Sequence, residues 1–158
     1  MGFGVEIPFV QLLGFELIAF ADGLSVIHYP PKPEHLNSFF VTHGGALMTL
    51  IDVSMAAAAR SVQPDMGVVT IEMKTQFMQA AVPSADGPLV AKGTLMHRTA
   101  TMAFTQSTVY DAKGRACAHG TGTFKYVRRL PGPDRNVHDL QTTADKGHLT
   151  SGGILSTD

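Results

Sequence analysis

The sequence predicts an α+β domain in which an antiparallel sheet encloses one long helix. The first observation is a run of Ala, Leu and Met residues at 44–61 that favours a helix and whose apolar side chains do not keep to one face. The second is a set of six strand-like segments, two before this run and four after it, with short turn-like links. Short links favour an antiparallel sheet, and a helix this apolar needs a sheet around it.

Proline and glycine residues predict the structure of the segments before the long helix. Pro8 near the start and Gly14 at the end predict a short helix over residues 7–14. Residues 21–23 have the turn composition of a hairpin. The proline-rich residues 30–33 exclude both a helix and a central strand, so an irregular loop leads to the long helix. The two predicted strands of this part are residues 15–20 and 24–29.

The four segments after the helix are rich in Val, Thr, Phe and Tyr, with turn signals at residues 84–88 and 111–114. Beyond residue 129 the composition changes to Pro, Gly, Asp, Thr and Ser, which cannot bury enough apolar surface to offset the entropy of ordering. We therefore predict one domain over residues 1–130 and a polar peripheral tail over residues 131–158. The predicted strands are residues 68–78, 89–97, 102–111 and 116–127.

The composition excludes several classes of function. The chain of 158 residues has 44% hydrophobic and 16% charged residues and a formal net charge of −1, without the basic excess typical of nucleic-acid-binding proteins. The single Cys117 cannot form an internal disulfide, and the seven histidines lack the spacing of metal ligands. We expect no structural metal and no nucleic-acid partner.

The sequence also predicts a soluble, cytoplasmic protein. The N-terminus lacks a basic region followed by an apolar core and a cleavage site, so it does not have the pattern of a signal peptide. The longest nearly uncharged run, residues 46–59, is shorter than the roughly 18 to 20 residues that span a bilayer, and it contains Asp52. We expect no membrane partner.

The stretch of residues 37–52 carries the pattern that indicates chemistry. Gly44 and Gly45 stand at the start of the long helix. Backbone N–H groups lack intrahelical partners there, and the helix dipole adds about half a positive charge. Such amides stabilise a carbonyl oxygen that gains negative charge in acyl transfer, which typically contributes on the order of a hundredfold or more in rate.

Asp52 is the only ionisable residue between His43 and Arg60, in a helix that otherwise has the composition of a core. Burial should raise the pKa of its carboxyl group, whereas a helix N-terminus or a hydroxyl such as that of Thr70 would favour the charged form. We interpret Asp52 as a nucleophile or general base. The alternative is a structural carboxylate that caps a neighbouring element or pairs with an arginine.

The spacing of His43 and Asp52 predicts a second subunit. Nine positions on a helix place the two residues on opposite faces and separate them by roughly 13 Å along the axis. One chain therefore cannot readily hold both against the same carbon. A site that uses both the helix N-terminus and the carboxylate needs a second copy, in a twofold dimer with two composite sites. Residues 68–78 form the strand that we expect to meet its twin.

Four residues near this pattern have simple interpretations. His43 either donates a hydrogen bond to the reacting group or serves as a structural residue at the helix start, and the sequence favours neither. Asn37 lies in a proline-bounded loop, where asparagine commonly serves a turn. By the two-residue period of a strand, Thr70 and Glu72 share one face.

The pattern resembles the PaaI-like thioesterases of the 4-hydroxybenzoyl-CoA thioesterase superfamily. The resemblance covers residues 15–127 and implies the hotdog fold, in which a sheet wraps a central helix. It also implies a homodimer, often a dimer of dimers, that hydrolyses acyl-CoA or aryl-CoA thioesters without a metal or an organic cofactor. The residues that carry the resemblance are Asn37, His43-Gly44-Gly45, Asp52 and Thr70.

The same resemblance implies a role for each residue. Asp52 is the nucleophile or the base that activates water, and the Gly44 N–H polarises the thioester carbonyl. Asn37 and His43 help to hold the reacting group, and Thr70 supports the acid or the water. Residues 97–100 read His-Arg-Thr-Ala, where relatives have a more glycine-rich turn that contacts CoA. The expected substrate-binding residues are Gly45, Met48, Phe77, Arg98 and Thr99.

Two other functions fit part of the pattern. A hotdog hydratase or dehydratase would need a histidine and an acid arranged to remove a proton from the acyl chain. The Pro-Gly-rich dehydratase signature is missing from this sequence. A non-catalytic acyl-CoA-binding protein would keep the pocket and dispense with the acid, so the presence of Asp52 favours an enzyme.

Overall fold

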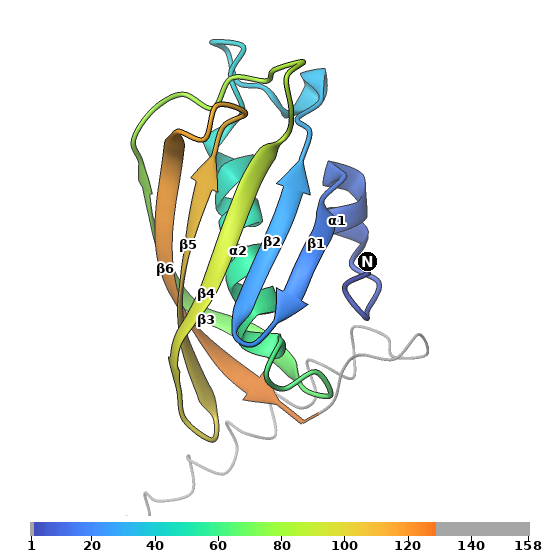
Figure 1. Ribbon diagram of the computed structural model, residues 1–158, viewed down its shortest axis with the longest axis vertical. Coiled ribbons are helices and arrows are strands. Elements are labelled where there is room, and N and C mark those ends of the chain that lie inside the picture. Colours follow the sequence, from blue (N-terminus) through green and yellow to red (C-terminus); the bar gives the residue numbers. More distant parts are fainter. Residues whose placement is uncertain (1, 129–158) are drawn as a thin grey trace, which may run out of the picture.

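A computed structural model of the chain describes residues 2–128. A six-stranded antiparallel sheet, in the order β1-β2-β4-β5-β6-β3, curls around the long helix α2 (Figure 1). This arrangement confirms the predicted hotdog fold, including the short N-terminal helix. The elements are α1 Pro8–Leu13, β1 Glu16–Ala21, β2 Leu24–Tyr29, α2 Gly44–Arg60, β3 Gly67–Phe77, β4 Leu89–Arg98, β5 Met102–Tyr110 and β6 Ala116–Val127.

Two features of the chain differ from the sequence-based expectation or lie beyond the described residues. The proline-rich loop contains a short 3-10 helix, η1, over Pro33–His35. The predicted tail, residues 131–158, and the last two residues of the predicted domain lie outside the described residues. The domain boundary therefore stays a prediction.

The helix α2 lies against the sheet through positions without side chains. A Cβ at Gly93 of β4 would overlap the carbonyl group of Ser54, whose carbon would be 2.8 Å away. A Cβ at Gly120 of β6 would lie 2.7 Å from Cγ2 of Ile51. Glycine at these positions lets the helix backbone approach the strands, which is a common reason for glycine inside a strand.

Hydrogen bonds hold α2 in this close contact. The Ser25 hydroxyl of β2 donates to the carbonyl oxygen of Ser54 at 2.7 Å. Near the end of the helix, the Tyr126 hydroxyl of β6 donates to the carbonyl oxygen of Ala59 at 2.8 Å. Leu50, Ile51 and Met55 are fully buried beneath the sheet. The helix is therefore fixed in depth and in rotation.

The sheet does not cover α2 all round. Met48 is 39% exposed, and Asp52 and Val53 are half-buried, although the sequence predicted an enclosed helix. These residues lie on the side of α2 that the strands leave uncovered. The expected enclosure thus holds for the face of the helix that lies on the sheet, and the other face is open in the protomer.

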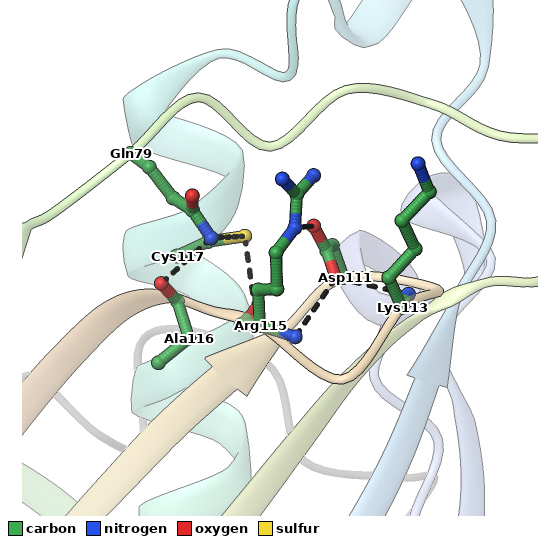
Figure 2. Close-up of polar contacts among 6 residues, drawn as sticks. All are labelled: Gln79, Asp111, Lys113, Arg115, Ala116 and Cys117. Carbon is green, nitrogen blue, oxygen red and sulfur yellow. Dashed lines mark hydrogen bonds and ion pairs between the residues drawn. The ribbon is translucent and has the colours of Figure 1, made fainter.

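The turn between β5 and β6 is closed by one carboxylate (Figure 2). Asp111 accepts hydrogen bonds from the backbone N–H groups of Lys113 and Arg115, both at 2.9 Å, and from Nε of Arg115 at 2.8 Å. The backbone bond from Arg115 contributes most to the lowered pKa of Asp111. Cys117 is buried beside this turn. Asp111, Arg115 and Cys117 therefore have a structural role in the hairpin.

Residues 2–128 contain neither a helix suited to cross a membrane nor a cluster of metal-binding side chains. No helix in this range combines the length and the apolar character that crossing a membrane requires. No group of three or more His, Cys, Asp or Glu side chains in the same range is arranged to hold a metal ion.

Substitution of Gly93 tests the close contact between α2 and the sheet. We expect Gly93→Ala to lower the free energy of unfolding by about 2 kcal/mol or more, because the added methyl group meets a backbone carbonyl that cannot move aside. The urea dependence of unfolding measures this change. Gly2→Ala is the matched control, because a Cβ there meets nothing within 4 Å. Equal midpoints for the two variants would contradict this account.

Candidate functional site

The N-terminus of α2 presents one free backbone amide. His43 is the N-cap residue, and its Nδ1 accepts a hydrogen bond from the Gly45 N–H at 2.8 Å. The N–H groups of Ala46 and Leu47 bond to the carbonyl oxygen of His43. Among residues 2–128, the Gly44 N–H has no hydrogen-bond acceptor. The amide that the sequence singled out is therefore available to a ligand.

The geometry of His43 is compatible with both of its interpretations. Its structural role is observed, because Nδ1 caps the helix. Since Nδ1 accepts a bond, the neutral ring carries its proton on Nε2. The side chain is exposed, so this second nitrogen can still donate to an outside partner.

The loop before α2 is held in shape by Asn37. The side-chain oxygen of Asn37 accepts from the N–H groups of Phe39 at 2.9 Å and Val41 at 3.3 Å, so the residue serves a turn. Its amide NH2 group has no acceptor within the described part of the chain, which leaves two donors beside the helix tip. Asn37 and Gly44 line the same cavity of about 310 Å³.

A buried tyrosine anchors this loop to the sheet. The Tyr29 hydroxyl bonds to Nδ1 of His35 at 2.9 Å, and the carbonyl oxygen of His35 accepts from the His43 N–H at 2.9 Å. Burial raises the pKa of Tyr29 to about 12, so its hydroxyl stays protonated as a donor. The position of the helix tip thus depends on a contact that starts in β2.

Asp52 lies in the middle of α2 with one side-chain partner. The Thr70 hydroxyl donates to Oδ1 of Asp52 at 2.7 Å. Burial raises the pKa of Asp52, and the bond from Thr70 lowers it by a smaller amount. No arginine or lysine forms an ion pair with Asp52 among the residues that the structure describes, and it caps no helix there. Neither structural alternative is therefore observed.

A β-bulge in β3 aims Thr70 at Asp52. Thr70 pairs with Phe124 of β6 and Glu72 pairs with the next residue, Thr123, so Ile71 is an extra residue in the ladder. Adjacent residues of β6 point to opposite faces, which places Thr70 on the helix side and Glu72 on the outer face. The expectation that both share one face was wrong, because the bulge breaks the two-residue period.

A second cavity opens beside Asp52. It has a volume of about 370 Å³ and lies between α2, the start of β3 and the N-terminal residues 3–8. Asp52 and Thr70 contribute polar atoms to a wall that also includes Val53, Ala56 and Val68. A carboxylate on the wall of a mostly apolar cavity is an arrangement typical of ligand sites.

Asp52 and Gly44 lie in different cavities of one protomer. They are eight residues apart on α2, which corresponds to about 12 Å along the helix axis. Gly45 and Met48 lie on the same side of the helix as Asp52, by the 3.6-residue period. The Phe77 ring stands over the helix tip, 3.5 Å from where a Cβ of Gly44 would be. The structure therefore brings the predicted residues together in two groups. Asn37, His43, Gly44 and Phe77 lie at the helix tip, and Asp52 and Thr70 lie at the middle of α2.

Arg98 and Thr99 lie far from both groups. The pairing of strands places Arg98 opposite Ala103, Ala103 opposite Phe124, and Phe124 opposite Thr70, so three strand spacings separate Arg98 from Thr70. The hydroxyl of Thr99 accepts from the N–H of Met102 at 3.0 Å and shapes the β4–β5 turn. Within one protomer these two residues do not reach Asp52.

Sequence reasoning missed Arg60, Phe3 and residues 5–8, which line the Asp52 cavity. The sequence did offer a signal for Arg60, because it is the one cationic residue in a mostly apolar helix. Residues 3–8 carry no such signal, because their place beside α2 arises from tertiary contacts.

Known proteins resemble this chain in sequence and in structure. A profile of the thioesterase superfamily matches residues 40–118, half of the chain. This range includes the helix tip, Asp52 and Thr70. A curated protein of Saccharolobus solfataricus, named as a candidate esterase, is 29% identical over 118 residues, which cover 75% of this chain and 82% of the relative.

Solved structures share the fold. Conserved protein PA5202 of Pseudomonas aeruginosa superposes with a TM-score of 0.73 at 26% identity, over 78% of this chain and 97% of that one. The Escherichia coli PaaI protein from the phenylacetic acid degradation operon superposes with a TM-score of 0.68 at 21% identity, over 78% of this chain and 85% of that one. The second likeness concerns the fold alone.

The raised pKa of Asp52 predicts a pH-dependent stability. The folded state binds this proton more tightly than the unfolded state, so the free energy of unfolding falls as pH rises through the folded pKa. We expect Asp52→Asn, which stays neutral, to resist urea better than the wild type at neutral pH. The difference should shrink below about pH 4, where an unfolded aspartate is protonated.

Urea midpoints measured across this pH range test the expectation. Asp65→Asn, at an exposed position, is the control for the change in net charge. Parallel pH profiles for the wild type and Asp52→Asn would show that burial of this carboxyl group has no energetic effect.

Proposed function

Because the chain belongs to the thioesterase superfamily, we propose that it hydrolyses the thioester of an acyl-CoA to a free acid and CoA. Thioester hydrolysis is the general reaction of this group, and the resemblance drawn from the sequence is confirmed at that level. The finer proposal rests on one observation. Asp52 is a carboxylate without a counter-ion among residues 2–128, bonded to Thr70 and set on the wall of a mostly apolar cavity.

Asp52 is proposed as the catalytic acidic group. It either attacks the thioester carbon directly or takes a proton from the water that attacks. In the direct route the Asp52 carboxylate forms a mixed anhydride with the acyl group as the carbon–sulfur bond breaks, and water then hydrolyses the anhydride to the free acid, restores Asp52 and supplies the proton that turns the CoA thiolate into a thiol. In the other route the attacking water gives its proton to Asp52 and its oxygen to the acyl carbon, the carbon–sulfur bond breaks, and the proton passes from Asp52 to the CoA sulfur. A raised pKa makes the carboxylate a stronger base than an exposed aspartate, and the Thr70 bond holds it in one orientation.

The Gly44 N–H is proposed to stabilise the negative charge on the thioester oxygen. This amide lacks a partner in the described chain and stands at the positive end of α2. The Asn37 amide group and Nε2 of His43 are donors near the same cavity and are proposed to hold the reacting group. Met48 and Phe77, both exposed, are proposed to contact the substrate.

We propose that two subunits share each site. The separation of about 12 Å between Gly44 and Asp52 is too long for one thioester group, so the carboxylate must face the helix tip of a second copy. The edge strand β3 supports this arrangement, because Val69 and Ile71 are 46% and 55% exposed. Paired edge strands would bury these side chains in an isologous interface. Pairing of two such dimers remains part of the proposal.

We propose that Gly45, Arg98 and Thr99 contact the substrate in this dimer. Arg98 is exposed and has no ion pair within residues 2–128. A guanidinium in this state suits a phosphate group of CoA. Because Arg98 lies three strands from Thr70 in its own protomer, its phosphate contact would lie away from the reacting carbon.

Substitution of Asp52 tests the catalytic assignment. We expect Asp52→Ala and Asp52→Asn to lower kcat by about a hundredfold or more, because both substitutions remove the nucleophile or base while the rest of the cavity stays intact. Release of CoA from short, medium and aromatic acyl-CoAs, followed with a thiol reagent, measures the change. Asp65→Asn again serves as the control. Normal turnover in a well-folded Asp52→Ala protein would refute the assignment.

A matched pair of variants tests the amide of Gly44. Gly44 is the first helical residue, where proline is well tolerated, and His43 before it has the extended backbone that a following proline requires. Gly44→Pro removes the N–H and Gly44→Ala keeps it. We expect Gly44→Pro to lose about a hundredfold in kcat and Gly44→Ala to retain far more activity. Equal activities would exclude the N–H as a donor.

Mixed dimers extend this test to the shared site. Subunits with Asp52→Asn, exchanged with subunits that carry Gly44→Pro, form heterodimers in which one of the two composite sites has both groups intact. Activity should therefore return on mixing. Absence of recovery, with subunit exchange proven by differently tagged chains, would show that each site lies within one subunit.

A further inference from the structure

Arg60 is a buried cation without a carboxylate partner in the described residues. It is the last residue of α2 and is 9% exposed. Its guanidinium donates to three backbone carbonyl oxygens: Nη1 to Phe3 at 2.9 Å, Nε to Met66 at 3.2 Å, and Nη2 to Pro64 at 3.3 Å. The side chain therefore ties the N-terminal segment to the end of α2.

Arg60 and Phe3 both line the cavity that contains Asp52. Asp52 and Arg60 are eight residues apart on α2, which makes about 12 Å along the axis. Between them the cavity is lined by apolar side chains, among them Val53 and Ala56. The cavity thus extends along α2 between Asp52 and the bond from Arg60 to Phe3, and the exposed Glu6 also contributes to its rim.

The size of this cavity suits an acyl group. Its volume of about 370 Å³ is more than twice that of an apolar protein cavity of about 150 Å³ that binds benzene. A thioester carbon placed at Asp52 would have its acyl chain beside this apolar space. The CoA moiety carries phosphate and polar groups, so it would pay a large desolvation cost in the same space.

We propose that this cavity receives the acyl group, and that Arg60 limits the length of the acyl chain by holding the backbone of Phe3 across the far end. The inference rests on the proposed acyl-CoA hydrolysis. Arg60 is a positioning residue, because it acts through Phe3. The substrate class is then an acyl-CoA with a medium-length apolar acyl group.

The three bonds of Arg60 explain why its removal should act on the far end of the cavity. The planar guanidinium offers donors in several fixed directions, which a methionine of similar reach cannot supply. Without them the segment at Phe3 loses its attachment to α2, while Asp52 and Thr70 keep their hydrogen bond two turns away. The limit on acyl length should relax.

Kinetics with butyryl-, octanoyl- and palmitoyl-CoA test this inference. We expect the wild type to prefer octanoyl-CoA, and Arg60→Met to raise the ratio of kcat/KM for palmitoyl-CoA to that for octanoyl-CoA by about tenfold or more, the scale of discrimination in apolar pockets. A loss of general stability would lower all three values by the same factor. That uniform outcome would overturn the role of Arg60.

A second variant acts in the opposite direction and does not depend on Arg60. Ala56 is half-buried on the cavity wall, one turn beyond Asp52, so Ala56→Leu fills the space. We expect the ratio of kcat/KM for octanoyl-CoA to that for butyryl-CoA to fall by about tenfold or more. Ala85→Leu, at an exposed position outside the cavity, is the matched control.

The outcomes separate the two proposals. Absence of CoA release from every thioester by the wild type would overturn the proposed function. Release with an unchanged chain-length profile in Arg60→Met and Ala56→Leu would overturn only the acyl cavity and the role of Arg60. A change in Ala56→Leu alone would keep the cavity and exclude Arg60 as its limit.

Discussion

The close contact between α2 and the sheet is the constraint on which the rest of this structure depends. Gly93 and Gly120 leave room for the helix backbone, and Ser25 bonds to the carbonyl oxygen of Ser54. A helix held at this depth cannot slide or rotate without overlapping the strands. The same contact therefore sets which face of α2 is buried and which face, with Met48 and Asp52, stays open.

The face of α2 that the sheet leaves partly open carries Asp52, the proposed catalytic residue. The bulge at Ile71 turns Thr70 toward Asp52, and the N-terminal segment closes the other side of the cavity through Arg60. Burial disfavours the charge of Asp52 while one hydroxyl supports it. Groups whose pKa is shifted by burial are common at functional sites, which fits the role proposed for Asp52.

The N-terminus and the middle of α2 have different roles in the proposed reaction. The helix N-terminus offers a backbone amide and partial positive charge, and its middle offers the carboxylate, about 12 Å away. A rigid helix cannot bring its own groups closer. In the proposed dimer, a twofold axis beside β3 would place the tip of one helix opposite the middle of the other.

The sequence by itself determined the element types, the fold class and the prominence of Asp52 and Gly44, because helix and strand periodicities, glycine and proline signals and an isolated charge are local properties. Only the tertiary structure decided that Thr70 and Glu72 face opposite sides, because the bulge depends on pairing with β6. It alone placed the N-terminal segment against Arg60, 57 positions away in the chain. Such contacts depend on how distant segments pack, which no local pattern encodes.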